Sequence, residues 1–166
     1  PNGANPGSTL IRSYTYNDAD NDPESGTIID WFRDGVQITN AGTTAASSLT
    51  AKNQEWYAVV TPSDGSDAGT SVTSNTLVIA NTIPTVGSPT IQPSSPESDD
   101  NLSYSASASD ADQDILTYET RWLLEGSVIS DLDNSQTVPS YATRNGENWS
   151  MEVRVDDGEA TSAWQA

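Results

Sequence analysis

The sequence contains no histidine and no cysteine, and it has only one methionine and one phenylalanine. Without cysteine there are no disulfides and no thiol nucleophiles. Without histidine there are no Ser-His-Asp triads and no imidazole acid–base chemistry, and the lack of both excludes zinc-finger sites. These absences exclude many classes of enzyme.

Basic residues are also scarce, because six Lys and Arg stand against 24 Asp and Glu, for a formal net charge of −18. Such a charge repels nucleic acids and anionic membrane surfaces, so cations are the expected partners. No apolar run approaches the roughly 18 to 20 residues that cross a bilayer. We therefore predict no nucleic-acid binding and no membrane insertion in this segment.

What the chain does contain is an internal repeat. Asp18-Ala19-Asp20-Asn21-Asp22 recurs as Asp110-Ala111-Asp112-Gln113-Asp114, a spacing of 110 − 18 = 92 residues. Other landmarks keep a spacing of 91 to 93 residues: Leu10 and Leu102, Trp31 and Trp122, Trp56 and Trp149, Asp64-Gly65 and Asp157-Gly158. A repeat of this length, with short alternating segments, is typical of one small β-sandwich per period.

Alternating side chains and turn residues support this interpretation. Trp56, Ala58 and Val60 share one parity, as expected of a strand with one buried face. Asp34-Gly35 and its counterpart Glu125-Gly126 predict hairpin turns. The predicted fold is all-β, with two tandem Ig-like antiparallel β-sandwich domains at residues 1–83 and 84–166.

The second repeat lacks its closing strand in this prediction. Two full periods need 2 × 92 = 184 residues, whereas the sequence has 166. Nothing after Trp164 replaces the strand predicted at Thr76–Ala80, and Trp164 itself aligns with Thr73. We expect a segment cut from a longer array. The alternative, donor-strand exchange between subunits, requires a spare strand-like segment at one terminus, and neither terminus carries one.

The acidic triplets predict calcium sites. Alternate carboxylates in Asp-x-Asp-x-Asp, bent around a tight loop, direct several hard oxygens to one centre, and calcium takes six to eight such ligands. The loops are not EF-hands, because Pro23 and Ile115 stand where that motif needs glycine. The alternative is a solvated acidic turn. The candidate ligands are Asp18, Asp20, Asp22, Asp64, Asp110, Asp112, Asp114 and Asp157.

The tryptophans and the carboxylates each permit a second interpretation. Trp31, Trp56, Trp122 and Trp149 fit inter-sheet core positions by parity, although sugar-stacking platforms are the alternative. Paired carboxylates can hydrolyse glycosides. Identical clusters in both repeats suit a structural ion better than a single active site, so we predict that this chain is not an enzyme.

The order of Leu, Asp-x-Asp-x-Asp, Trp, Gly, Trp, Asp-Gly and then Asn-Thr-x-Pro resembles calcium-binding Ig-like repeats of microbial surface proteins, of the cadherin-like and PKD-type style. The resemblance implies an extracellular or cell-surface stalk, adhesin or filament, with Ca²⁺ stiffening the loops and with neighbouring copies of the repeat as partners. The rival functions are an adhesive module that binds glycans and a spacer beside an enzyme.

Overall fold

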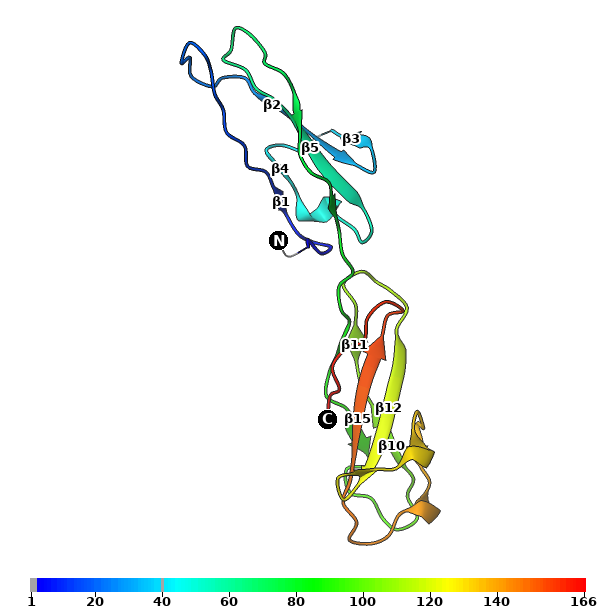
Figure 1. Cartoon of the computed structure of the whole chain (residues 1–166). Coiled ribbons are helices and arrows are strands. Elements are labelled where there is room, and N and C mark those ends of the chain that lie inside the picture. The colour runs from blue at the N-terminus through cyan, green and yellow to red at the C-terminus, as the bar shows by residue number, and fades with distance from the viewer. Residues whose placement is uncertain (1–2, 40) are drawn as a thin grey trace. The chain divides into compact units, whose positions relative to one another are not determined.

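The chain divides into two compact units, Pro1–Asn81 and Thr82–Ala166. The computed structural model describes residues 3–39 and 41–166. The regular secondary structure of each unit consists mainly of antiparallel strands, so the predicted all-β fold is confirmed and is consistent with a β-sandwich (Figure 1). The division after Asn81 lies two residues before the boundary predicted from the sequence.

In the first unit one larger sheet faces a two-stranded ribbon. The larger sheet has the order β3-β2-β5-β6, with β7 also paired to β5, and the ribbon pairs β1 with β4. The elements are β1 Leu10–Ile11, β2 Ile28–Arg33, β3 Val36–Ile38, β4 Thr44–Ala45, the 3₁₀ turn η1 Ser47–Leu49, β5 Glu55–Thr61, β6 Val72–Thr73 and β7 Leu77–Val78.

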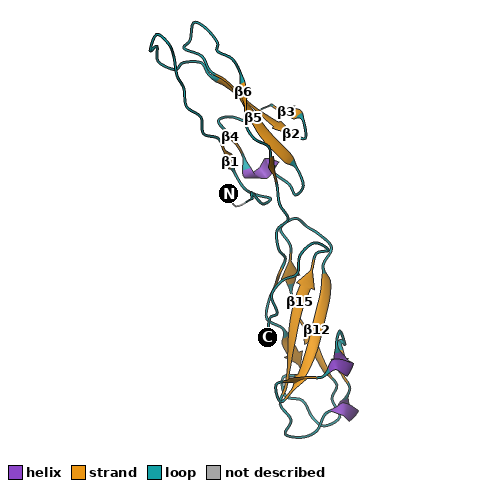
Figure 2. Ribbon diagram, viewed as in Figure 1, coloured by secondary structure: helices purple, strands orange, loops and turns teal. Residues whose placement is uncertain are grey.

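The second unit has the sheets β13-β12-β15, β14-β10-β9 and β11-β8. Figure 2 shows the strands of both units and the short helical turns that connect some of these strands. The elements are β8 Thr85–Val86, β9 Thr90–Gln92, β10 Leu102–Ser105, β11 Ala108–Ser109, β12 Thr117–Leu124, β13 Ser127–Val128, η2 Ser130–Leu132, β14 Thr137–Val138, η3 Ser140–Ala142 and β15 Trp149–Asp156.

The two predicted hairpin turns are confirmed. Asp34 and Gly35 have φ values of 52° and 78°, and Glu125 and Gly126 have values of 52° and 77°. Two successive residues with positive φ are typical of a type I′ turn, whose twist matches that of the two paired strands. Each turn therefore fixes the register of a hairpin, β2 with β3 and β12 with β13.

Tryptophan forms the centre of each core. Trp31 and Trp56 are 5% and 1% exposed and pack edge to face, with ring centroids 6.4 Å apart. Trp122 is fully buried and makes a similar contact with Tyr104 at 6.4 Å. Such aromatic pairs contribute about 0.5–1.5 kcal/mol beyond area burial. The core interpretation of these tryptophans is confirmed, whereas Trp149 is only partly buried.

Trp164 lies on the outer face of the β13-β12-β15 sheet. Its ring stacks against the guanidinium groups of Arg121 and Arg154, at 4.3 and 4.6 Å from the ring centroid. Those arginines pair across the strands with Glu152 and Glu119. Charged side chains of β12 and β15 therefore cover the outer face of this sheet, and the tryptophan lies over them.

The alignment of Trp164 with Thr73 is wrong by two residues. Gln165 pairs with Val153, and in the first unit Val72 pairs with Val60. Since 165 − 72 and 153 − 60 both equal 93, Trp164 corresponds to Ser71. The shift arose because the sequence offers no turn residue that distinguishes the two registers after Asp157-Gly158.

In the described part of the chain the helical elements are three-residue 3₁₀ turns, and no helix is long and apolar enough to span a membrane.

Candidate metal centre

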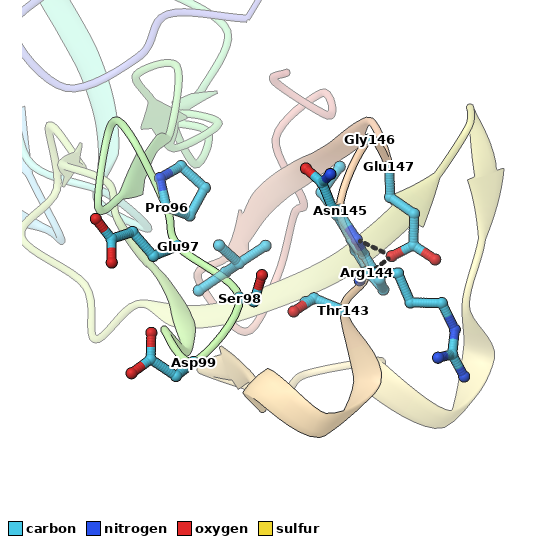
Figure 3. Close-up of a pocket in the computed structure, with 11 residues that line it drawn as sticks. Pro96, Glu97, Ser98, Asp99, Thr143, Arg144, Asn145, Gly146 and Glu147 are labelled. Atoms are coloured by element: carbon cyan, nitrogen blue, oxygen red, sulfur yellow. Dashed lines mark hydrogen bonds between the residues drawn. The ribbon is translucent and has the colours of Figure 1, made fainter.

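The acidic loops lie at one end of the second unit, and a cavity lies at the other. The cavity, of about 470 Å³, is lined by residues 96–99 and 143–147 with Leu102 and Trp149 (Figure 3). Thr117 pairs with Asp156 at the acidic end of β12, whereas Leu124 pairs with Trp149 at the cavity end. Eight residues of strand separate the two features, about 25 Å at 3.4 Å per residue. The acidic loops and the cavity are therefore separate features of the second unit.

The first aspartate of each triplet organises its own loop. Asp110 Oδ1 accepts hydrogen bonds from the backbone N–H groups of Asp112 and Asp114, at 2.8 and 3.2 Å. Asp18 Oδ1 accepts the same pair of bonds from Asp20 and Asp22, at 2.8 and 3.1 Å. An aspartate side chain readily closes such a turn over the following residues. The fourth position of each triplet loop, Asn21 or Gln113, takes a positive φ of 63° or 64°.

The aspartate of each Asp-Gly pair organises a second loop. Asp157 Oδ1 accepts from the N–H groups of Glu159 and Ala160, at 2.7 and 2.6 Å. Asp64 Oδ1 accepts from Ser66 and Asp67, at 2.6 and 2.7 Å. In the first unit these donors, that of Asp67 first, hold the pKa of Asp64 below its ordinary value, because they favour the charged carboxylate.

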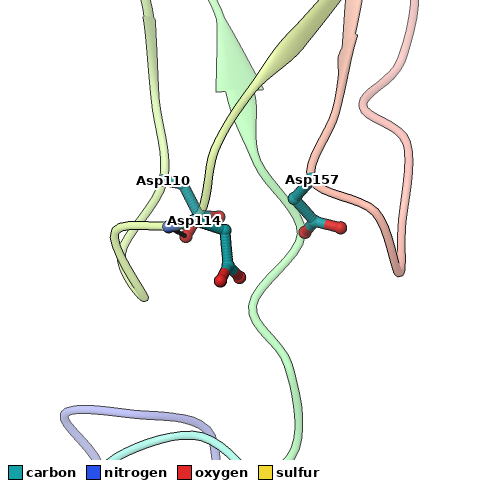
Figure 4. Close-up of side chains that lie close together, drawn as sticks. All are labelled: Asp110, Asp114 and Asp157. Carbon is teal, nitrogen blue, oxygen red and sulfur yellow. Dashed lines mark hydrogen bonds between the residues drawn. The ribbon is translucent and has the colours of Figure 1, made fainter.

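The two loops bring three carboxylates together in the second unit. One oxygen each from Asp110, Asp114 and Asp157 lies within 4.8 Å of the others (Figure 4). Asp157 is only 8% exposed, and Asp110 and Asp114 are partly buried. Asp110 Oδ2 is buried and has no hydrogen-bond partner among the described residues. Like charges are therefore held close together where water only partly screens them.

The middle aspartate of the second triplet points elsewhere. Asp112 Oδ2 accepts from the backbone N–H of Thr82 at 2.7 Å, and Asp112 Oδ1 accepts from the Thr82 hydroxyl at 3.4 Å. The triplet loop is thus attached to the first residue of the second unit. Sequence reasoning missed this role, because Asp112 was assigned to the metal with its neighbours.

The first unit holds its carboxylates more openly. Asp18 and Asp64 line a common cavity of about 160 Å³ together with Tyr16. Burial raises the pKa of Tyr16, and the nearby carboxylates of Asp18 and Asp64 raise it further. Asp20 and Asp22 are exposed. Among the described residues, three metal-binding groups converge in the second unit but not in the first.

A cluster of three carboxylates suits a hard cation. Aspartate oxygens are the ligands that Ca²⁺ prefers, and Ca²⁺ completes its six to eight positions with backbone carbonyls and water. At a separation of 4.8 Å and an effective dielectric of 20, two carboxylates repel by about 3.5 kcal/mol. A bound divalent cation would replace that repulsion with attraction.

Comparison with protein-family models and with curated proteins gives no match to this chain. The chain does allow an internal comparison, because its two units carry the same loops. The same pair of backbone bonds closes each triplet, on Asp18 and on Asp110. The repeat seen in the sequence is therefore also a repeat of the triplet loop's hydrogen bonds.

Proposed function

We propose that this chain is a structural segment of two tandem Ig-like β-sandwich domains, that it works in an extracellular filament, stalk or surface array, and that Ca²⁺ stiffens it. The observation that carries the proposal is the convergence of Asp110, Asp114 and Asp157, from two loops, to within 4.8 Å. A structural cation fits these carboxylates because each loop already fixes one of them by backbone hydrogen bonds.

Calcium would act by joining the two loops. Asp110 and Asp114 precede β12, and Asp157 follows β15, so one ion bound to all three would hold the ends of both strands. Because Asp112 accepts a hydrogen bond from Thr82, the fixed triplet loop would also hold the residue at which the second unit begins. Loops that are fixed where the chain enters the second unit would resist local opening and proteolysis there.

The adhesive alternative needs exposed aromatic rings in a row. Trp31, Trp56 and Trp122 are 5%, 1% and 0% exposed, and Trp164 is stacked with two arginines. These four tryptophans therefore supply no row of exposed rings, which favours the structural role over the adhesive one. The structural role is therefore the function we propose, with copies of the same repeat as the expected neighbours.

Chelation tests the calcium part of this proposal. We expect the melting temperature and the resistance to limited proteolysis to rise when Ca²⁺ is added and to return to their starting values with EGTA. Mg²⁺ at equal concentration is the control for general screening of the charge of −18, because Mg²⁺ requires a tighter octahedral site and gives up its water reluctantly. Equal responses to both ions, or no response, would contradict a calcium site.

A further inference from the structure

Two tyrosines of the second unit form the walls of a pocket that contains no charged side chain. Tyr104 on β10 and Tyr118 on β12 line it together with Ser105, Ala106 and Gln136, around a volume of about 340 Å³. We propose that this pocket binds one neutral hexopyranose unit of a glycan. The proposal adds a binding function to the structural role above, and it does not depend on the metal centre.

The walls of the pocket belong to the central strands of two sheets. β10 lies between β14 and β9, and β12 lies between β13 and β15. Tyr104 pairs with Ile91 in this arrangement, and Tyr118 pairs with Val155. The two rings are therefore held in place before a ligand arrives, which lowers the entropy lost on binding. Because an extended peptide adds to an edge strand, central strands favour a compact ligand.

A buried hydroxyl lies behind the two tyrosines. Thr120 shares the inner face of β12 with Tyr118 and Trp122 by strand alternation, and it is 4% exposed. Burial raises the pKa of Tyr104, and the neighbouring Thr120 hydroxyl lowers it in part. Thr120 Oγ1 is buried without a hydrogen bond of ordinary geometry to the described residues. Since a buried hydroxyl without a partner is costly, a ligand hydroxyl that reached it would be bound more firmly.

The first unit places larger side chains at the same positions. Since 104 − 12 and 106 − 14 both equal 92, Arg12 corresponds to Tyr104 and Tyr14 to Ala106. The Arg12 guanidinium lies over the Tyr14 ring, 4.9 Å from its centroid, and the Tyr14 hydroxyl donates to Glu24. The second unit has a methyl group at the position of that ring. The pocket therefore follows from an amino-acid difference inside the repeat.

The chemistry of the lining selects a neutral ligand rich in hydroxyl groups. The side chains of Tyr104, Ser105, Tyr118 and Gln136 offer both donors and acceptors, and none is charged at neutral pH. In a chain with a net charge of −18, an anion is repelled from the surface and a cation is drawn to the acidic loops. A pyranose suits these groups, because its hydroxyls also donate and accept while its C–H faces pack on aromatic rings.

A single site of this kind binds weakly, and repetition compensates for that. A methyl hexoside has about 13 non-hydrogen atoms, and at the efficiency typical of drug-sized ligands this gives a Kd of about 1 mM. In an array of such chains, as proposed above, linked sites raise the effective concentration for one another. One sugar unit in each second unit is therefore enough for an array to hold a glycan that has several such units.

Titration of methyl glycosides into the ¹⁵N-labelled full chain, followed by NMR, tests the proposal. The panel contains the α and β methyl glycosides of glucose, galactose, mannose and N-acetylglucosamine, in EGTA and again with calcium. We expect at least one of them to give saturable shifts at Tyr104, Tyr118 and the Gln136 side-chain amide. If none does so in either buffer, the proposal is overturned. Shifts at Asp110 and Asp157 with calcium alone report the metal centre, so the two proposals succeed or fail separately.

Two variants separate the pocket from the fold. Ala106→Tyr fills the pocket with the residue of the first unit, and Tyr118→Thr removes a wall by placing there the residue found at the corresponding position, Thr27. Each should weaken binding by at least about 10-fold. If Ala106→Tyr disturbs the fold, Tyr118→Thr still decides, because Tyr118 is 40% exposed. The control Tyr141→Thr, at a side chain 87% exposed in η3, should leave binding unchanged.

Two further results would also overturn the proposal. The first is equal binding of a glycoside by the parent and by the variant Tyr118→Thr. The second is a set of saturable shifts at Tyr104 and Tyr118 with a polyproline peptide and with no glycoside, which would assign the pocket to a peptide partner instead.

Discussion

The Asp110→Asn variant should be more stable than the parent protein without metal and less stable than the parent with calcium. The asparagine keeps one oxygen to accept from the N–H groups of Asp112 and Asp114, so the loop keeps its internal bonds. The substitution removes one of the three converging charges, and with it two of the three repulsive pairs. Its amide also places a hydrogen-bond donor beside the two remaining carboxylates.

The expected gain in stability without metal follows from the two repulsive carboxylate pairs that the substitution removes. At an effective dielectric of 20 the repulsion is about 3.5 kcal/mol per pair at 4.8 Å. Asp110 and Asp114 are partly exposed, and screened pairs contribute only about 0.2–1 kcal/mol each. We therefore expect the variant to be more stable than the parent by about 0.5–2 kcal/mol in EGTA.

Calcium should invert this order. Extracellular calcium modules bind with Kd values of about 10⁻⁴ to 10⁻³ M, so 10 mM Ca²⁺ would stabilise the parent by about 1.4–2.7 kcal/mol. The variant has lost a ligand and should gain much less. In a unit of this size about 1 kcal/mol moves the melting temperature by about 4–8 °C, which differential scanning calorimetry resolves.

The matched control is Asp131→Asn, which removes one exposed charge in η2, outside the cluster. It should leave the response to calcium unchanged. If Asp110→Asn lowers stability equally in EGTA and in calcium, the three carboxylates are an ordinary turn and the metal proposal is wrong.

Three further perturbations test other parts of the structure. Ile79→Ala should destabilise the first unit by about 2–5 kcal/mol in urea unfolding, because Ile79 is fully buried, whereas Val36→Ala, at a side chain 66% exposed, should change it by less than about 0.5 kcal/mol. Because folding lowers the pKa of Asp64, the Asp64 carboxylate stabilises the folded state at pH values above its unfolded pKa of about 3.9, and this stabilisation is lost as the pH falls through its folded pKa. Asp64→Asn should therefore flatten the acid limb of a stability–pH curve below about pH 4. Trp164→Ala removes two cation–π contacts and should cost about 1–2 kcal/mol in the second unit, an effect that high salt should leave largely intact if stacking dominates; an unchanged unfolding midpoint would show that the ring contributes nothing.

Much of the fold could be predicted because the strands are amphipathic and the turns have strong local chemistry. Trp31 and Trp122 lie in the cores at the parity that the alternation indicated. Asp34-Gly35 forms its hairpin because the turn needs positive φ values, which this pair adopts readily. These signals are local, so one sequence was enough to read them.

The site could be predicted only in part, because it depends on contacts between distant segments. The spacing placed Asp110, Asp114 and Asp157 among the candidates, and the structure brings these three together. In the structure Asp112 instead accepts a hydrogen bond from Thr82, 30 residues away in the sequence, and no local pattern indicates this contact.

A crystal structure of the chain grown in calcium would test the proposed metal centre most directly. We expect one ion with oxygen ligands from Asp110, Asp114 and Asp157 at about 2.3–2.6 Å, completed by carbonyl oxygens and water. Calcium-saturated crystals that show only water between these carboxylates, or an ion bound elsewhere while they stay apart, would contradict it.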